Sequence, residues 1–178
     1  MDAGFTLKVK KNRYLTEEDI EDVINLCSNA FNEDFRPYMK DFVGGTHILG
    51  YCEDVLVSHV LWLNRWVRIE NQLLLKTSFV DAMAVDEKYR KRGFASSMMT
   101  RLVGEITKYD IVVLTTNSPD YYKRLGWKEW KRPVNFRRVD GRITSLKDST
   151  LMVLSLPKTP PLDVHLPLTV VWREGEGW

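Results

Sequence analysis

The 178-residue chain has few cysteines, no excess charge of one sign and no long apolar run. Its 2 cysteines, Cys27 and Cys52, form no Cys-x-x-Cys pair, which excludes a disulfide framework and indicates reduced thiols. The 26 Lys and Arg residues nearly balance the 24 Asp and Glu residues, which argues against a dedicated nucleic-acid-binding protein. The most apolar stretch, Val55–Leu63, is too short to cross a bilayer, and no signal-peptide core follows Met1. We therefore expect a soluble, cytoplasmic protein that binds neither nucleic acid nor membrane.

The residues that are present are typical of one globular domain. Hydrophobic residues make up 44% of the chain and charged residues 28%. A chain of this length buries a sizeable core without disulfides or metal, and no repeat or low-complexity tract divides it. We therefore expect residues 1–178 to form a single domain.

Helix and strand signals alternate along the first half of the chain. Thr16, followed by three acidic residues up to Asp19, is typical of a helix N-terminus, where a hydroxyl caps the backbone and acidic side chains favour the positive end of the dipole. Pro37 marks a second helix start. Three strand-like runs joined by short turns then predict an antiparallel meander: Thr46–Cys52, Val55–Ile69 and Leu73–Val85.

The second half continues this alternation. Apolar residues at helical spacing predict a helix from Ala95 to Ile106. A short strand is predicted at Ile111–Thr115, and Ser118-Pro119 indicates another helix start. Two further strands are predicted: Leu151–Leu156 and Leu168–Trp172. This order of elements predicts an α+β, or mixed α/β, fold.

A basic turn that contains glycine lies between the third strand and the following helix. Its sequence is Arg90-Lys91-Arg92-Gly93-Phe94-Ala95. The first N–H groups of a helix have no partner within the helix and suit a phosphate, and glycine allows a ligand to approach the backbone closely. The two arginines add charge for a pyrophosphate or a 3′-phosphate. The alternative is a basic surface turn that only joins a strand to a helix.

This turn resembles the acetyl-CoA pyrophosphate loop of the GNAT superfamily, an Arg or Gln, two residues, Gly, one residue, then Gly or Ala. Over most of its length the chain further resembles the aminoglycoside 2′-N-acetyltransferase family. Four pieces carry this resemblance: Phe31–Phe35 with Gly44–His47, Val80–Val85, Tyr122–Trp127 with Trp130, and the C-terminal Trp172–Trp178. The resemblance implies the GNAT fold, a central, mixed and strongly twisted sheet flanked by helices, and acetyl-CoA as co-substrate, with no metal.

The resemblance also implies roles for individual residues. Asp81 stands where the family usually has Glu, and it would accept the amine proton through a water molecule. Tyr122 would protonate the CoA sulfur, whereas a tyrosine taken alone is more often a packing residue. The acetyl donor would lie between the parallel strands Leu73–Val85 and Ile111–Thr115. The residues that would contact it are Met83, Ala84, Val85, Arg90, Lys91, Arg92, Gly93, Phe94 and Ala95.

The acceptor of that family is a polycation, so the resemblance implies an acidic pocket. The residues that would line it are Glu33, Asp34, Asp81, Thr115, Glu176 and Trp178, the last through its α-carboxylate. For Glu33 and Asp34 the alternative is a solvated surface pair. The chain departs from the family at Tyr38, which stands in place of an acidic residue. His47 and His59 have no partner at metal-ligand spacing and are interpreted as structural.

The leading hypothesis is acetylation of the 2′-amino group of an aminoglycoside or aminocyclitol, which would give antibiotic resistance. The departures in the substrate loop keep an atypical acceptor of the kasugamycin type open. One alternative is a GNAT enzyme that acts on another amine, such as a polyamine, a cell-wall amino sugar or a protein amine. Another is a non-catalytic acyl-CoA-binding regulator, which would need neither Asp81 nor Tyr122. The resemblance also implies a homodimer.

Overall fold

The computed structural model describes residues 4–70, 74–137, 140–146 and 149–171, and their contacts form two compact units. Of the described residues, the first unit holds those up to Leu63 and Asp81–Glu105, and the second holds Asn64–Val80 and those after Glu105. Two long strands, β3 (Val55–Ile69) and β4 (Leu74–Val85), contribute to both units. No helix within the described ranges is long and apolar enough to cross a membrane. A single domain over residues 1–178 stays a prediction.

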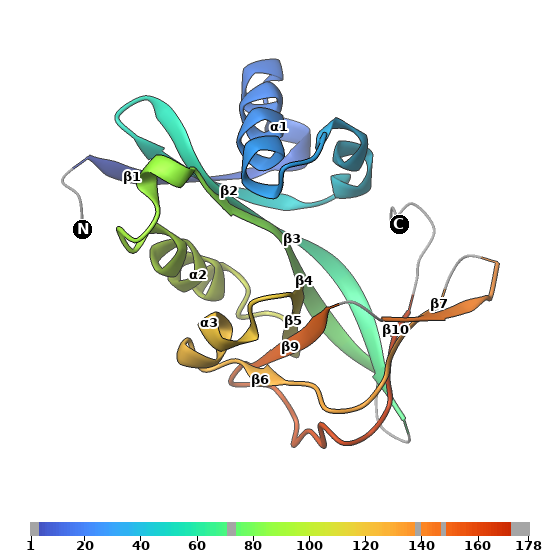
Figure 1. The fold of residues 1–178 in the computed structure, drawn as a ribbon. Coiled ribbons are helices and arrows are strands. Elements are labelled where there is room, and N and C mark those ends of the chain that lie inside the picture. The colour runs from blue at the N-terminus through green and yellow to red at the C-terminus, as the bar shows by residue number, and fades with distance from the viewer. Residues whose placement is uncertain (1–3, 71–73, 138–139, 147–148, 172–178) are drawn as a thin grey trace. The chain divides into compact units, whose positions relative to one another are not determined.

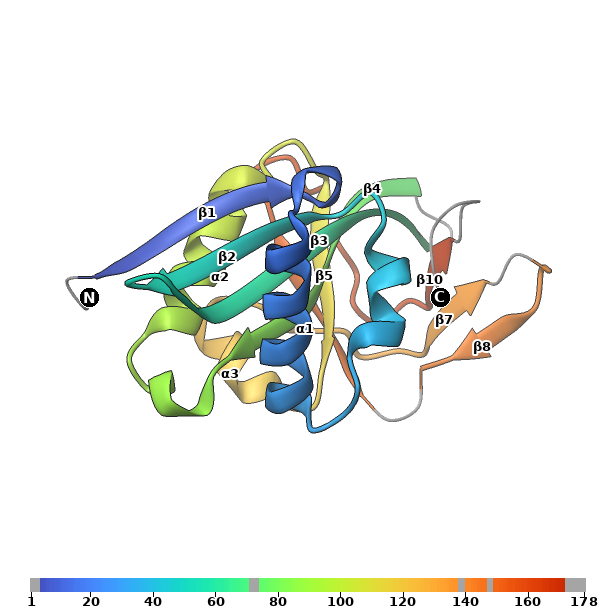
Figure 2. The same cartoon turned by 90° about the horizontal axis from the view of Figure 1, so that it is seen from above.

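The first unit is built on antiparallel strands. β1 (Phe5–Lys11) pairs with β2 (Thr46–Cys52), and β2 pairs with β3. Figure 1 shows α1 (Glu17–Phe31) on one side of these strands and α2 (Phe94–Glu105) on the other, and in Figure 2 α1 crosses over them. Three short 3-10 helices complete the unit: η1 (Asn12–Tyr14), η2 (Arg36–Phe42) and η3 (Glu87–Tyr89).

Helix α1 begins where the sequence predicts. The Thr16 hydroxyl accepts a hydrogen bond from the Asp19 N–H at 3.1 Å, and the Asp19 carboxylate accepts one from the Thr16 N–H at 2.8 Å. This reciprocal capping box contributes about 1 kcal/mol to helix stability. The same carboxylate lies 2.7 Å from Lys10 Nζ, so an ion pair joins the start of α1 to β1.

The core of the first unit lies between α1 and the strands. Each large apolar side chain buried there contributes about 1.5–3 kcal/mol. The core residues come from α1, the segment around η2 and the strands β2, β3 and β4: Val23, Leu26, Cys27, Phe35, Phe42, Leu49, Tyr51, Leu56, Leu61, Leu63, Ala82 and Ala84.

The second unit contains a mixed sheet, with the strand order β6-β9-β5-β4-β3-β10-β7-β8. β4 and β5 are parallel, with Thr77 opposite Ile111 and Val80 opposite Leu114. β9 is antiparallel to β5, and β10 is parallel to β7 and antiparallel to β3. Its remaining elements are β5 (Ile111–Thr116), α3 (Pro119–Arg124), β6 (Lys128–Glu129), β7 (Val134–Arg137), β8 (Ile143–Ser145), β9 (Thr150–Ser155) and β10 (Leu168–Val171).

The mixed α/β class and the main predicted elements are confirmed. β2 and β3 have the predicted bounds, and β4 and β5 are parallel as the resemblance implies. Pro37 lies at the start of η2 and Pro119 at the start of α3. The predicted strand ends Leu73 and Trp172 lie outside the described residues. Strands β1, β6, β7 and β8 are missing from the prediction. Both cysteines are free thiols.

Candidate active site

The backbone of strand β4 leaves the extended conformation at Ala82, next to Asp81, and this departure is called the kink of β4. Ala82 has a φ of +48°, a left-handed conformation that costs a residue with a Cβ about 1–2 kcal/mol. From Thr77 to Val80 every side chain of β4 is buried, whereas from Asp81 to Val85 half-buried and buried side chains alternate. Asp81, Met83 and Val85 are half-buried, whereas Ala82 and Ala84 between them are buried. The Ala82 N–H donates to Asp81 Oδ1 at 2.6 Å, which orients the carboxylate.

A pocket of about 440 Å³ lies beside Asp81 in the first unit. Its lining combines aromatic rings with carboxylates: Phe31, Glu33, Phe35, Tyr38, Asp41, Phe42, Asp81 and Ala82. The rings cluster around Phe35, whose centroid lies 5.6 Å from that of Phe31 and 5.3 Å from that of Tyr38. Carboxylates and the faces of aromatic rings both attract cations, so the pocket suits a molecule that carries amino groups.

Local turns decide which acidic side chains line this pocket. Glu33 accepts a hydrogen bond from the Tyr38 hydroxyl at 3.1 Å, and this bond raises the pKa of Tyr38. Asp34 instead accepts a hydrogen bond from the Arg36 N–H at 3.1 Å and is not among the lining residues. Asp41 of η2 supplies a carboxylate that the sequence analysis missed, because no periodicity or motif singles it out.

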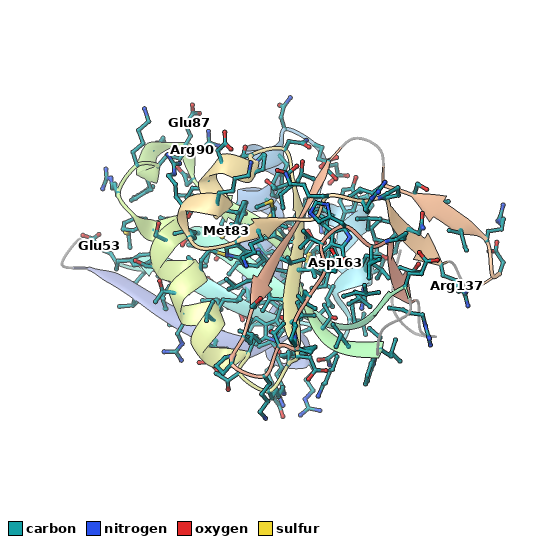
Figure 3. The ribbon with its side chains drawn as sticks, turned by 90° about the horizontal axis from the view of Figure 1, so that it is seen from below. Glu53, Met83, Glu87, Arg90, Arg137 and Asp163 are labelled. Carbon is teal, nitrogen blue, oxygen red and sulfur yellow. The ribbon has the colours of Figure 1, made fainter. Side chains whose placement is uncertain are left out.

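The loop between β4 and α2 contains the predicted phosphate-binding turn. Gly93 has a φ of +84°, and a Cβ at this position would meet no atom within 4 Å, so backbone conformation rather than space favours glycine. The exposed Arg90 donates from Nε to the Val85 carbonyl at 3.4 Å, and Figure 3 shows it projecting from this loop. Helix α2 begins directly afterwards at Phe94, so its first N–H groups and the arginine together suit an anion.

Two of the predicted donor-binding residues have side chains in the interior. Phe94 is buried and stacks on Phe5, with ring centroids 4.0 Å apart, and Ala84 belongs to the core of the first unit. Acetyl-CoA would therefore contact the backbone atoms of these two residues and not their side chains. Lys91 and Arg92 have exposed side chains, as binding of phosphate groups requires.

The second unit contains the predicted acid, Tyr122, on α3. Its side chain is buried, and its ring meets Trp127 edge to face with centroids 5.7 Å apart. Thr115 is half-buried on β5, opposite Leu151 of β9. Glu176 and Trp178, which the resemblance assigns to the acceptor pocket, lie outside the described residues.

Comparison with known proteins identifies the family. The family model described as the acetyltransferase (GNAT) domain matches residues 11–130, which include α1, the pocket, the basic loop and α3. The chain belongs to the GNAT acetyltransferase family. An aminoglycoside 2′-N-acetyltransferase of Mycolicibacterium fortuitum is 27% identical to it over 172 residues, which cover 92% of this chain and 87% of that relative.

Solved structures of GNAT proteins share the fold of this acetyltransferase. The E. coli GNAT family N-acetyltransferase YhbS, solved in complex with CoA, has a TM-score of 0.65 at 18% identity and covers 96% of this chain and 91% of its own. A conserved protein of unknown function from Enterococcus faecalis has a TM-score of 0.60 at 18% identity, and this chain spans 32% of its length. Within the described part of the GNAT acetyltransferase, no group of three or more His, Cys, Asp or Glu residues is arranged to hold a metal ion.

Proposed function

We propose that this GNAT acetyltransferase transfers the acetyl group of acetyl-CoA to the 2′-amino group of an aminoglycoside or aminocyclitol. The observation that carries the proposal is the pocket beside Asp81, where Glu33 and Asp41 add carboxylates to a wall of aromatic rings. A polycationic acceptor matches this charge. The likeness to the M. fortuitum relative, which extends over 92% of the chain, supports the same acceptor class.

The acceptor amine must lose a proton as it attacks the thioester carbon. Asp81 lines the pocket, and its orientation is set by the Ala82 N–H, so it is the carboxylate that takes this proton through a water molecule. The other carboxylates act as counter-charges for the remaining ammonium groups. The resemblance would add Glu176, which lies outside the described residues, to these counter-charges.

Acetyl-CoA is bound by backbone groups of β4 and by the basic turn that follows this strand. The backbone of β4 at Met83 and Val85 binds the pantetheine arm and polarises the thioester carbonyl, and the turn from Arg90 to Ala95 binds the phosphates. When the new C–N bond forms and the C–S bond breaks, Tyr122 gives its proton to the leaving sulfur. The products are the N-acetyl amine and CoA. The enzyme acts as a homodimer in the cytoplasm.

A second acceptor class is favoured by one specific observation. Four of the residues that line the pocket are aromatic, Phe31, Phe35, Tyr38 and Phe42. Such a wall also suits a small amine with a flat apolar body, because ring faces bind both aromatic groups and cations.

The test is CoA release from acetyl-CoA with matched acceptors. Kanamycin B carries a 2′-amine and kanamycin A a 2′-hydroxyl, so turnover on the first and not on the second is the expected result. Kasugamycin tests the atypical scaffold, and 2-phenylethylamine tests the apolar class. Equal turnover on both kanamycins would contradict 2′ specificity, and turnover on 2-phenylethylamine alone would replace the proposed acceptor.

Two variants test the assignment of the pocket. Asp41→Asn removes a carboxylate that lines the pocket, whereas Asp34→Asn removes a neighbouring one that does not. We expect the first to raise KM for the amine about fivefold, since an exposed charge pair contributes about 1 kcal/mol, and the second to leave KM unchanged. The opposite order of effects would show that the acceptor binds elsewhere.

A further inference from the structure

A row of hydrogen-bonded polar side chains ends at the kink of β4. His59 of β3 is fully buried, and its Nδ1 lies 2.9 Å from the Ala82 carbonyl oxygen. The other ring nitrogen, Nε2, lies 2.9 Å from Nδ1 of His47 on β2, which is also fully buried. His47 Nε2 in turn lies 3.1 Å from Oδ1 of Asn12, which is half-buried. All four residues belong to the first unit.

The acceptor at the end of the row determines where each proton lies. A carbonyl oxygen only accepts, so His59 must carry its proton on Nδ1. Burial lowers the pKa of both histidines and keeps them neutral, which leaves His59 Nε2 as an acceptor for the Nδ1–H of His47. His47 Nε2 then has no proton and needs a donor, so the NH2 group of Asn12 must take the position that Oδ1 has in the structure, which is a flip of the amide. The thiol of Cys27, 3.7 Å from His59 Nδ1, is a weaker second neighbour.

The two histidines meet because of strand register. His47 lies opposite Leu61 and His59 lies opposite Leu49, so the two histidines occupy diagonal positions on one antiparallel pair. Their rings lie 5.2 Å apart between centroids. Neither side chain reaches the acceptor pocket as a lining residue, so neither contacts the reacting groups directly.

The residue that receives this hydrogen bond has a conformation that its own side chain disfavours. Alanine adopts a positive φ only when its surroundings impose it. The Nδ1–H group of His59 on β3 donates a hydrogen bond to the Ala82 carbonyl oxygen. The N–H group of the same alanine donates to Asp81 Oδ1, so both backbone polar groups of Ala82 are bonded. The direction of the peptide groups on either side of Ala82 sets where Asp81 and Met83 point.

We infer that His59, oriented by His47, is a positioning residue that holds Ala82 in its left-handed conformation and thereby directs Asp81 and the Met83 backbone toward the reacting groups. This inference rests on the proposed function for its catalytic consequence. Its structural content, a fixed Nδ1–H tautomer bonded to the Ala82 carbonyl, does not depend on the identity of the acceptor.

The matched variants follow from the geometry of the side chains. In His59→Asn the amide NH2 takes the place of Nδ1–H and keeps the donor, whereas His59→Leu removes it. The double variant His59→Leu with Ala82→Gly lets the kink form without help, because glycine adopts positive φ freely. We expect kcat of His59→Leu to fall at least about tenfold, since a misplacement of about 1 Å can cost a hundredfold.

We expect His59→Asn to keep most of the turnover and the double variant to recover most of the loss. If His59 only packed in the core, neither variant would keep turnover. Asparagine fills the space of histidine poorly, and Ala82→Gly fills none of the space that His59→Leu leaves. The inference is overturned if His59→Asn is as slow as His59→Leu, or if the double variant is no faster than His59→Leu.

Nitrogen-15 NMR of the imidazoles supplies a readout that needs no acceptor. The expected spectrum shows His59 and His47 as Nδ1–H tautomers at pH 7, with an Ala82 carbonyl carbon shift that changes in His59→Leu and not in His59→Asn. An Nε2–H tautomer for His59 would overturn the inference. If the wild-type enzyme acetylates none of the amines tested, the proposed acceptor fails on its own, and the NMR result still decides whether His59 holds the kink.

Discussion

Lowering the pH should destabilise this protein through its two buried histidines. Burial lowers the pKa of His59 to about 4, although its bond to the Ala82 carbonyl opposes this, and burial together with the neighbouring His59 lowers the pKa of His47 to about 3. Both start from an ordinary value of 6.5 in the unfolded chain. Below pH 6.5 both histidines are therefore protonated in the unfolded chain but stay neutral in the folded chain. Because the unfolded chain binds more protons, the free energy of unfolding falls as the pH falls toward 4.

The size of the effect follows from the difference between these pKa values. At pH 5 nearly every unfolded chain carries the proton on His59, whereas about a tenth of the folded molecules do, which lowers the free energy of unfolding by about 2 kcal/mol relative to pH 8. His47 adds a similar amount, so the pair removes about 4 kcal/mol from a total that is about 5–15 kcal/mol in most proteins. Asp19 has a lowered pKa, so its contribution to the stability of the fold is lost only as the pH falls below the ordinary value of 3.8, outside this window.

The assay is urea unfolding at pH 8, 7, 6 and 5 for the wild type and for His59→Asn, which keeps the donor to Ala82 but does not titrate. We expect the wild type to lose about 2 kcal/mol more than the variant between pH 8 and pH 5. Parallel curves for the two proteins would refute the reasoning, because they would mean that His59 does not have to stay neutral when the chain folds.

Four further changes test other parts of the structure. Thr16→Ala should lower the free energy of unfolding by about 1 kcal/mol through loss of the α1 cap, while Thr16→Ser should not, as measured by calorimetry. Tyr122→Phe should lower kcat about a hundredfold without changing the Kd of acetyl-CoA measured by titration calorimetry, and unchanged turnover would remove the tyrosine from the mechanism. Arg90→Ala should raise KM for acetyl-CoA and weaken its dependence on salt, with KM for the amine unaffected. Ala82→Val should lower both unfolding free energy and kcat, because a branched residue tolerates positive φ poorly, whereas Ala82→Gly should leave kcat near the wild-type value.

The sequence predicts the elements of this fold well where local patterns are strong. The bounds of β2 and β3 follow from apolar runs separated by short polar turns, and the start of α1 follows from its cap. β1 was missed although its signal is present, because Phe5, Leu7 and Val9 alternate with polar residues that look like a charged surface segment. β6, β7 and β8 contain two to four residues each, too few to show any period.

The acceptor pocket is only partly predictable. Asp81 and Glu33 follow from the family resemblance and line the pocket. Asp34 and Asp41 differ by the direction of their side chains, which depends on a local turn at Arg36 and on the path of η2. Residue type and spacing do not distinguish the two aspartates, because both stand among polar and aromatic residues of one segment, and only the fold makes Asp41 half-buried and leaves Asp34 exposed.

The kink at Ala82 shows why the most consequential feature of the site has no local signal. Positive φ is expected from the sequence at glycine and asparagine, whereas an alanine between Asp81 and Met83 predicts an ordinary extended strand. What opposes the alanine's preference is a donor 23 residues away in sequence, His59, itself held by a histidine on another strand. A violation of local preference persists only where other contacts impose it, and such violations concentrate at functional sites. From the sequence, both histidines are interpreted as structural. In the structure, His59 contacts the strained Ala82 and His47 contacts His59, so the buried pair accounts for the positive φ of the alanine.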